Sequence, residues 1–314
     1  MKTFDNLYNE LQHGENSEMN DLLKKAQAES KKSNRISLMI CLIIDAFIIF
    51  GGLSGEVPSF MKGMVIYQII FSIIAVDILV ITFTKLIFGK SYREYSKKYK
   101  SVIIDKLMSN FYDNAEYFPI KPVPEYIYTE PGYEEYYNRY YSDDYLEGEI
   151  DNKYSIQMGE ITTKKVTRSN GRSHTVTKFS GLFAKVVMHK SMQGELRIMR
   201  DGRYALDNKL KMDSSEFEKY FDVKSSDNIK GMQLLTADVM EELMDFVNNT
   251  QMIFDIVIRN NYLYLRFHSG SMFEPRNIKG DSLNKEEIQK YFYMLNFTYN
   301  LSKRLISLIE ETEM

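Results

Sequence analysis

Two long apolar stretches near the start of the chain, residues 36–53 and 64–88, constrain the fold more than any other feature. As helices they would extend about 27 Å and 37 Å, against a hydrocarbon core of about 30 Å. Ten residues separate them, so the pair is typical of a membrane hairpin. The alternative is a pair of buried helices in a soluble protein, although core helices usually keep a polar face over such lengths.

Lysine and arginine flank both outer ends of this hairpin. Five lie between residues 24 and 35 and six between 85 and 100, whereas the connecting loop, residues 54–63, carries only Lys62. Because cytoplasmic loops are enriched in these residues, we predict two membrane spans with both termini in the cytoplasm. Composition rich in Lys, Ile, Asn and Tyr without Trp is typical of an AT-rich bacterial genome, so we expect a bacterial cell membrane protein.

Each apolar stretch contains one aspartate, Asp45 in the first and Asp77 in the second. Counted from the cytoplasmic ends of their spans, they would lie at depths of about 14 Å and 17 Å, so they can meet. Two close carboxyls in hydrocarbon do not both ionise cheaply, and we expect at least one to be protonated and hydrogen-bonded to the other. The pair either stabilises helix packing or couples protons or ions, and both roles stay open.

Small and polar residues of the second stretch also lie on the side opposite to Asp77. At 100° per residue this second side contains Gln68, Ser72, Ala75 and Thr82. The first span can cover only one side, and polar groups in lipid seek helix neighbours. We therefore predict a homo-oligomer or a partner membrane protein at this face. The alternative is that lipid tolerates these residues, because hydroxyls can bond back to their own helix.

The sequence pattern divides the chain into five parts. The predicted fold class is α+β, with a transmembrane hairpin, a helical stalk and a cytosolic domain of largely antiparallel sheet packed with helices. The parts are a polar helical segment (1–35), the hairpin (36–88), the stalk (89–118), the α+β domain (119–283) and a C-terminal amphipathic helix (284–314). The single cysteine, Cys41, lies in the first span, so no intramolecular disulfide can form.

Alternating patterns predict the strands of the domain. Residues 161–167 and 173–179 alternate around Asn170-Gly171, a type I′ turn signal, so we predict a hairpin there. Further strands are expected at 182–188 and 195–199. Residues 254–267 also alternate around Asn260-Asn261, which predicts a second hairpin.

Two helices are predicted beside this sheet. Five tyrosines between residues 133 and 141 have helical spacing, which favours a helix packed on the sheet. Thr236 is expected to cap a helix that begins at Ala237. Both would contribute side chains to the core of the domain.

Charge is segregated along the domain. Between residues 113 and 151 eleven acidic residues stand against two basic ones, whereas between 160 and 200 nine basic residues stand against two acidic ones. We expect these segments to lie near one another. The alternative is a basic surface that meets anionic lipid headgroups, because the domain would be tethered close to the membrane. No nucleic-acid partner is expected, since no RNP-type, helix-turn-helix or zinc signature accompanies the positive charge.

The search for a catalytic or ligand site is negative. The sequence contains no glycine-rich phosphate loop, no GxSxG and no Cys or His spacing for a metal, so we assign no catalytic, cofactor-binding or metal residue and expect no cofactor. The neighbouring Asp143 and Asp144 favour a cap or turn over an acid/base pair, because adjacent residues do not share a face. An enzyme is not the expected class.

Three runs of the domain resemble a known family. They are Phe179-Ser180-Gly181-Leu182-Phe183 and residues 212–223 and 234–240, and residues 140–145 also fit. They resemble the family called domain of unknown function 3137, which is found in bacterial membrane proteins. The resemblance covers most of residues 140–275 and implies two membrane passes with a cytosolic domain. It implies no activity, because the family has no established one, and no residue role.

Three functions are compatible with these features. The leading one is a membrane-anchored interaction or assembly protein that contacts membrane lipid and whose cytosolic domain binds an unknown cytosolic protein. The second is coupling of protons or ions through the intramembrane carboxyls. The third is a membrane-tethered enzyme of unknown chemistry.

Overall fold

The computed structural model describes residues 1–311 except 15, 54–61, 134, 170, 203–207 and 276–282. The chain forms two compact units. The helical unit contains residues 11–99 and 275–284, and the sheet unit contains residues 1–10, 100–274 and 285–314. Helix α1 (Phe4–Gly14) is divided between them. Each unit is described by itself.

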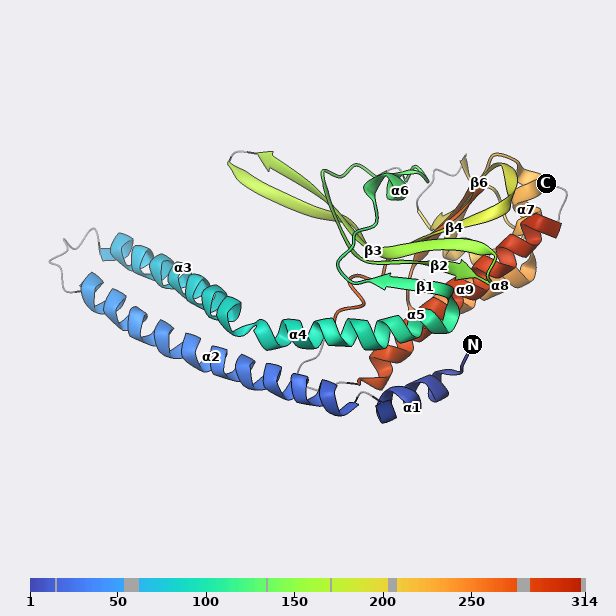
Figure 1. The fold of residues 1–314 in the computed structure, drawn as a ribbon. Helices are drawn as coiled ribbons and strands as arrows, with labels where there is room; N and C mark the ends of the chain where they lie inside the picture. The colour runs from blue at the N-terminus through green and yellow to red at the C-terminus, as the bar shows by residue number, and fades with distance from the viewer. Residues whose placement is uncertain are drawn as a thin grey trace. The chain divides into compact units, whose positions relative to one another are not determined.

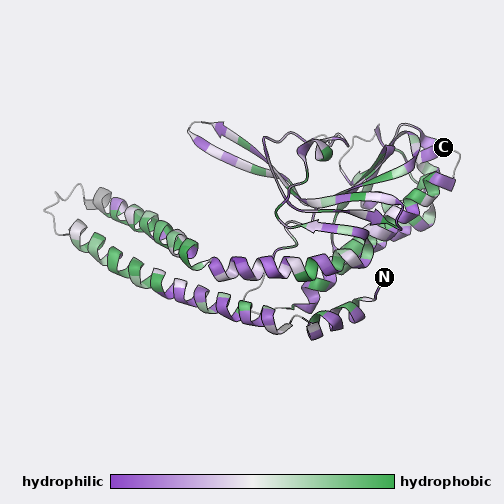
Figure 2. Cartoon of the chain, viewed as in Figure 1, coloured by the Kyte–Doolittle hydropathy of each residue, from purple (hydrophilic) through white to green (hydrophobic). Residues whose placement is uncertain are grey.

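Two long helices dominate the helical unit. Helix α2 (Asn16–Leu53) continues unbroken from the polar lead-in into the first apolar stretch, and α3 (Lys62–Phe88) contains the second. Figure 1 shows the two helices side by side, and Figure 2 shows apolar residues along α3 and the C-terminal half of α2. Both are long and apolar enough to span a membrane.

The apolar side chains of these two helices point outward. Only 11% of the most apolar window of α2 and 6% of that of α3 are buried. Phe50 is 77% exposed and Phe71 is 75% exposed. A core helix of a soluble protein would bury such side chains, so this alternative from the sequence does not fit the hairpin as folded.

Polar contacts join the helices within the unit. The hydroxyls of Ser37 on α2 and Thr84 on α3 are hydrogen-bonded to each other. The polar half of α2 pairs instead with α4 (Lys90–Tyr99), where Ser91 Oγ donates to Glu29 over 2.7 Å. The apolar and polar halves of α2 therefore have different helical neighbours.

The helical region after α3 is shorter than the predicted stalk, residues 89–118. After α4 come a π-helical turn (Lys100–Ile104) and α5 (Asp105–Phe111), and strand β1 (Asp113–Phe118) then begins. Residues of β1 pair with the next strand, as in Tyr117 with Leu146. Strand pairing supplies backbone partners that helical periodicity in the sequence does not reveal.

The sheet unit is built on one six-stranded antiparallel sheet, which confirms the predicted α+β class. Its strand order is β1-β2-β3-β4-β5, and β6 also pairs with β4. Besides β1, the strands are β2 (Arg139–Ile150), β3 (Tyr154–Ser169), β4 (Arg172–Arg200), β5 (Phe221–Ser225) and β6 (Phe254–Phe267).

Strand β4 is the centre of this sheet. Its first half pairs with β3 on one edge and β6 on the other, so Leu182 lies opposite both Glu160 and Phe267. Its second half pairs with β5 and β6, so Leu196 lies opposite Ser225 and Ile258. The predicted hairpin between β3 and β4 is confirmed, whereas the strands predicted at 182–188 and 195–199 belong to one 29-residue strand.

The second predicted hairpin, over residues 254–267, is wrong. These residues form the single strand β6, and Asn260 adopts φ +55° without reversing the chain. Asn260 lies opposite Met192 of β4. Because β4 is long enough to offer partners to both halves of β6, neither half needs the other.

The predicted tyrosine helix over residues 133–141 is also wrong. A short helix, α6 (Glu125–Thr129), precedes this segment, and the described residues from 131 to 137 are turn or irregular before β2 begins. The tyrosine rings nevertheless enter the core. Tyr128 packs against the rings of Tyr133, Tyr137, Tyr140, Phe179 and Phe183.

Helices cover the sheet near the end of the chain. They are a 3-10 turn (Phe217–Lys219), α7 (Asn228–Leu234), α8 (Ala237–Thr250) and α9 (Lys285–Glu311). The predicted cap is confirmed, because the Thr236 hydroxyl accepts from Val239 N. Phe297 of α9 stacks on Phe246 of α8 at 3.8 Å between ring centroids and contacts Phe254 of β6. These aromatic contacts fix both helices on the sheet.

Candidate functional site

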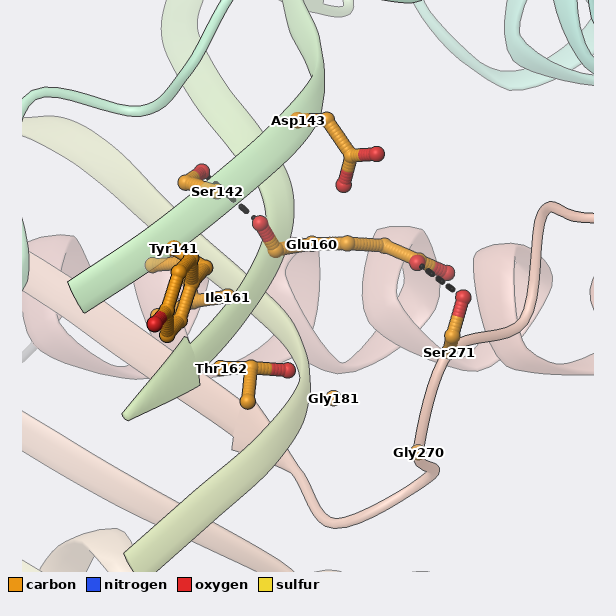
Figure 3. Close-up of a pocket in the computed structure, with 9 residues that line it drawn as sticks. All are labelled: Tyr141, Ser142, Asp143, Glu160, Ile161, Thr162, Gly181, Gly270 and Ser271. Carbon is orange, nitrogen blue, oxygen red and sulfur yellow. Dashed lines mark hydrogen bonds between the residues drawn. The ribbon is translucent and has the colours of Figure 1, made fainter. Parts of the chain in front are cut away.

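Three carboxyl groups meet where β2 and β3 pair, and Figure 3 shows the cavity beside them. Asp143, Asp144 and Glu160, here called the acidic cluster, each offer an oxygen within 4.8 Å of the others. Asp143 lies opposite Glu160 in the register, and the pairing is then interrupted until Leu146. Asp144 adopts φ +54° in this bulge. The bulge lets two neighbouring residues reach the same site, which regular alternation forbids.

Asp144 is the most deeply buried member of the cluster. Its Oδ2 lies 2.9 Å from Nζ of Lys100, and its Oδ1 accepts a hydrogen bond from the hydroxyl of Tyr117. Lys100 also lies 2.6 Å from Glu274 Oε1 and 4.0 Å from Asp143. One ammonium group therefore faces several carboxylates, and the set carries an excess of negative charge when all are ionised.

Glu160 connects β3 to the loop after β6. Its carboxylate accepts hydrogen bonds from Ser271 Oγ at 2.9 Å, from Phe273 N at 2.8 Å and from Met272 N. The backbone carbonyl of Glu160 accepts from Ser142 Oγ over 2.7 Å. These donors hold the side chain across the cavity and fix the loop on the sheet.

Burial shifts the acidity of all three groups. It raises the pKa of Asp144 to about 6, although Lys100 and Tyr117 oppose the shift. Burial also raises the pKa of Glu160 to about 7, against the opposing backbone hydrogen bonds from Met272 and Phe273. The pKa of Asp143 is raised by burial as well. Asp144 and Glu160 therefore hold their protons at a higher pH than an ordinary carboxyl does.

The cavity beside the cluster is small. Its volume of about 150 Å³ is below the several hundred cubic ångströms typical of organic ligand sites. Its lining consists of Tyr141, Ser142, Asp143, Glu160, Ile161, Thr162, Gly181, Gly270 and Ser271. Such a cavity has room for water or an ion and not for a cofactor of ordinary size.

Carboxylate oxygens are the ligands that Mg²⁺ and Ca²⁺ prefer, so the acidic cluster is where the described residues could hold a divalent cation. Lys100 already supplies positive charge to Asp144, and the oxygens of Glu160 are occupied by three donors. A divalent cation would have to displace the ammonium or bind beside it. The geometry fits a proton-exchanging charge network better than a preformed metal site.

A second buried charge network lies on β6. The guanidinium of Arg266 lies 2.5 Å from Asp255 Oδ2 and 3.1 Å from Glu135, and His268 Nε2 lies 2.9 Å from Asp255. Despite burial, the hydrogen bond from His268 and the charge of Arg266 hold the pKa of Asp255 at about 2. The Arg266 guanidinium also stacks on Tyr133 at 3.9 Å. Asp255 and Glu135 thus share one buried cation, Arg266.

The predicted intramembrane pair lies on α2 and α3. Asp45 and Asp77 each have a buried Oδ1 atom that has no hydrogen-bond partner among the described residues. Cys41, one turn from Asp45, is buried and has Asp77 as a hydrogen-bonding neighbour. The expected hydrogen bond between the two carboxyls, and its role, stay predictions.

The second predicted face of α3 lies apart from α2. Gln68, Ser72, Ala75 and Thr82 are exposed, while Thr84 on the other side is buried against α2. The Thr82 hydroxyl bonds back to the carbonyl of Ile78 over 2.7 Å. For Thr82 this bond agrees with the alternative, that hydroxyls bond back to their own helix and lipid tolerates them. The oligomeric role of the face stays a prediction.

Sequence reasoning missed the acidic cluster because it treated Asp143 and Asp144 as residues of opposite faces. A signal was present, since Asp tolerates positive φ better than most residues. Lys100, Tyr117 and Glu274 are far apart in sequence and carry no shared pattern. Their convergence depends on tertiary structure.

Comparison with known proteins identifies one family. Searches of curated proteins and of solved structures gave no match. A family model matches residues 177–306, which span β4 to most of α9 and contain three of the motif runs, whereas residues 140–145 lie outside the matched part. Position 181, within the first run, requires glycine, because a Cβ atom there would lie 1.8 Å from the carbonyl oxygen of Phe267. Residues 177–306 match the family described as "Protein of unknown function (DUF3137)".

Proposed function

We propose that this chain is a membrane-anchored interaction protein of the bacterial cell membrane, in which α2 and α3 form the anchor. The sheet unit faces the cytoplasm and binds a basic segment of another protein. The anchor is supported by the outward-facing apolar residues of both helices. The orientation is supported by the basic residues at both outer ends of the hairpin.

A groove between α8 and α9 carries the binding part of the proposal. It has a volume of about 810 Å³, large enough for several side chains of a partner. Its lining consists of Asp238, Glu241, Glu242, Asp245, Phe246, Asn249, Thr250, Tyr293, Asn296, Phe297, Asn300 and Arg304. We call it the α8–α9 groove.

The four acidic residues of this groove, Asp238, Glu241, Glu242 and Asp245, recur at the spacing of one helix face. Arg304 lies 3.3 Å from Glu242 and 3.4 Å from Asp238, so it offsets only part of their charge. The surplus is negative, and a partner that carries Lys or Arg is complementary to it.

Aromatic side chains supply the apolar part of the groove. Tyr293 is an exposed aromatic residue of α9, and Phe246 and Phe297, which stack on each other, also line the groove. Aromatic residues are enriched in protein-binding surfaces, whose rims are polar. A basic amphipathic helix, with apolar residues toward the aromatic rings and cations toward α8, is the partner that this chemistry fits.

The full chain in lipid nanodiscs, titrated with a synthetic 18-residue amphipathic helix of Lys and Leu, tests the groove. We expect Glu241→Gln with Asp245→Asn to weaken binding about tenfold, since each exposed ion pair contributes roughly two- to fivefold. The matched control, Asp213→Asn with Glu216→Gln, removes the same charge outside the groove and should bind like the parent. Equal binding by both double variants would exclude the groove.

A second function is favoured by one observation, the unpaired buried oxygens of Asp45 and Asp77. Unsatisfied carboxyls inside hydrocarbon are typical of proton pathways. Reconstituted liposomes with a pH-sensitive dye inside test it. Proton leak that disappears in Asp45→Asn and Asp77→Asn, with unchanged insertion, supports coupling. If the dye signals of the parent and the two variants were identical, both residues would serve helix packing alone.

A further inference from the structure

The outer part of the β3–β4 pair is a positively charged projection. Residues 164–169 and 171–178, here called the basic hairpin, start at the last pair with β2, Lys164 opposite Arg139, and then extend beyond the rest of the sheet in Figure 1. They contain Lys164, Lys165, Arg168, Arg172 and Lys178, together with His174. No acidic residue occurs between Ile161 and Gln193. The five positions from 165 to 169, beyond the last pair with β2, correspond to a projection of about 17 Å.

These cations are not neutralised within the described part of the chain. None of the five forms an ion pair with a described residue, in contrast to Lys185 at the base of β4, which pairs with Glu130. The ammonium groups of Lys164 and Lys165 instead lie over the aromatic rings of Tyr141 and Tyr136. The acidic segment predicted to screen this charge pairs with β3 as far as Lys164, and none of its described carboxylates forms an ion pair with the five cations.

The strand register distributes the charge over both faces of the hairpin. Lys164 pairs with Thr177 and Arg168 with Ser173, so these two cations share one face. Lys165 and Arg172 lie on the other face, opposite Val176 and Ser169. A single flat acidic protein surface would reach only one face. A layer of anionic headgroups can surround the end of the hairpin and contact both.

The side chains between the cations are short and polar. Thr167, Ser169, Ser173, Thr175 and Thr177 alternate with the basic residues, and all are exposed. Val166 and Val176 are isolated and lie on opposite faces. This composition suits contact at headgroup depth and lacks the large apolar residues that would insert into acyl chains.

We infer that the basic hairpin binds anionic lipid headgroups of the membrane in which the chain is anchored. The inference rests on the proposed anchor. Only eleven residues separate Phe88, at the end of α3, from Lys100, at the start of the sheet unit, so the domain is tethered near the lipid surface. Basic residues near an anionic leaflet each favour contact by about fivefold. The hairpin adds a second attachment that orients the domain.

The test uses the full chain with Cys41→Ser and Ser173→Cys, labelled with a fluorophore at residue 173 and reconstituted in nanodiscs. The lipid carries a headgroup nitroxide quencher and is either phosphatidylcholine alone or phosphatidylcholine with phosphatidylglycerol. We expect strong quenching only with phosphatidylglycerol and its loss at high salt. Arg168→Gln with Arg172→Gln should lower the ratio of bound to free hairpin about 25-fold.

A matched control, Lys211→Gln with Lys219→Gln, removes two cations elsewhere in the sheet unit and should leave quenching unchanged. Equal quenching in neutral and anionic discs, or no effect of the arginine substitutions, overturns the inference. Quenching is also compared between discs that hold one chain and discs that hold two. If a second copy of the chain protects the label from the quencher, the inference is overturned as well. A chain that does not co-elute with the discs would instead contradict the anchor, so the two failures are distinguishable.

Discussion

The ammonium group of Lys100 lies 2.9 Å from Oδ2 of Asp144, and only 6% and 0% of the two side chains are exposed. Lys100 enters from the π-helical turn after α4, and Asp144 enters from the bulge in β2. A buried pair of this kind is costly to break, because removing one partner leaves the other charge without compensation.

Lys100→Met should therefore lower the free energy of unfolding by about 3 kcal/mol. Chemical denaturation of the detergent-solubilised chain, followed by circular dichroism, measures the loss. Lys106→Met is the control, since Lys106 lies on the neighbouring helix and makes an exposed ion pair with Glu10. The double variant Lys100→Met with Asp144→Asn should regain most of the loss. A double variant no more stable than Lys100→Met would contradict the coupling.

Glu160 predicts a pH dependence of stability. Its pKa is about 7 in the folded chain and about 4.3 when unfolded, so the folded state holds the proton more tightly between these values. Stability from this group is full below the unfolded pKa and is lost as the pH rises through 7, with a slope of up to about 1.4 kcal/mol per pH unit. Glu160→Gln should flatten the curve between pH 5 and 7.

Unfolding midpoints at half-unit pH intervals give the measurement. Glu216→Gln, at an exposed position, should keep the slope of the parent. A Glu160→Gln curve parallel to that of the parent would mean that Glu160 does not change its protonation on folding.

Gly181 predicts a strong size limit at one position. Its φ is +156°, and a Cβ atom would lie 1.8 Å from the carbonyl oxygen of Phe267 and 2.8 Å from Ser269 N. Gly181→Ala should destabilise the sheet unit by about 3 kcal/mol, because backbone atoms of β4 and β6 must separate. Gly14→Ala, where the added Cβ meets open space, should be neutral or slightly stabilising. Thermal unfolding of the two variants compares them directly.

The exposed face of α3 predicts disulfide crosslinks between chains. In a Cys41→Ser background, Ser72→Cys and Ala75→Cys should form dimers on mild oxidation in membranes. Ile74→Cys is the control, since Ile74 is exposed on another side of α3, whereas Ile73 is partly buried on the side of α2. Crosslinks of equal yield at all three positions would indicate random collision, and none at Ser72 or Ala75 would exclude this interface.

Sequence pattern was sufficient where one local rule decides the structure. Apolar length predicted the two long helices, a threonine cap predicted α8, and alternation predicted the β3–β4 hairpin. Sequence pattern failed where a partner that is distant in the sequence decides the local structure. The turn-like Asn260 lies within a strand because β4 pairs with both halves of β6, and the tyrosines near residue 137 are packed by Phe179 and Phe183 without a helix.

The site shows the same limit. A bulge and the positive φ of Asp144 bring the side chains of Asp143 and Asp144 to the same site. Lys100, which pairs with Asp144, is 44 residues away from it in the sequence. Backbone strain and long-range ion pairs leave no periodic trace in a sequence. Asp45 and Asp77 of the two apolar helices, by contrast, are visible in the sequence, because charge is rare in an apolar stretch.

The length of β4 has a consequence for synthesis on the ribosome. Leu182 finds its β6 partner only when Phe267 has been made, 85 residues later. At roughly 5–20 residues per second, this edge of β4 waits about 4–17 s for its partner. During that interval an apolar strand edge is open to any other extended chain. Other nascent chains on the same polysome are the nearest such chains, so slow translation between β4 and β6 should increase misassembly.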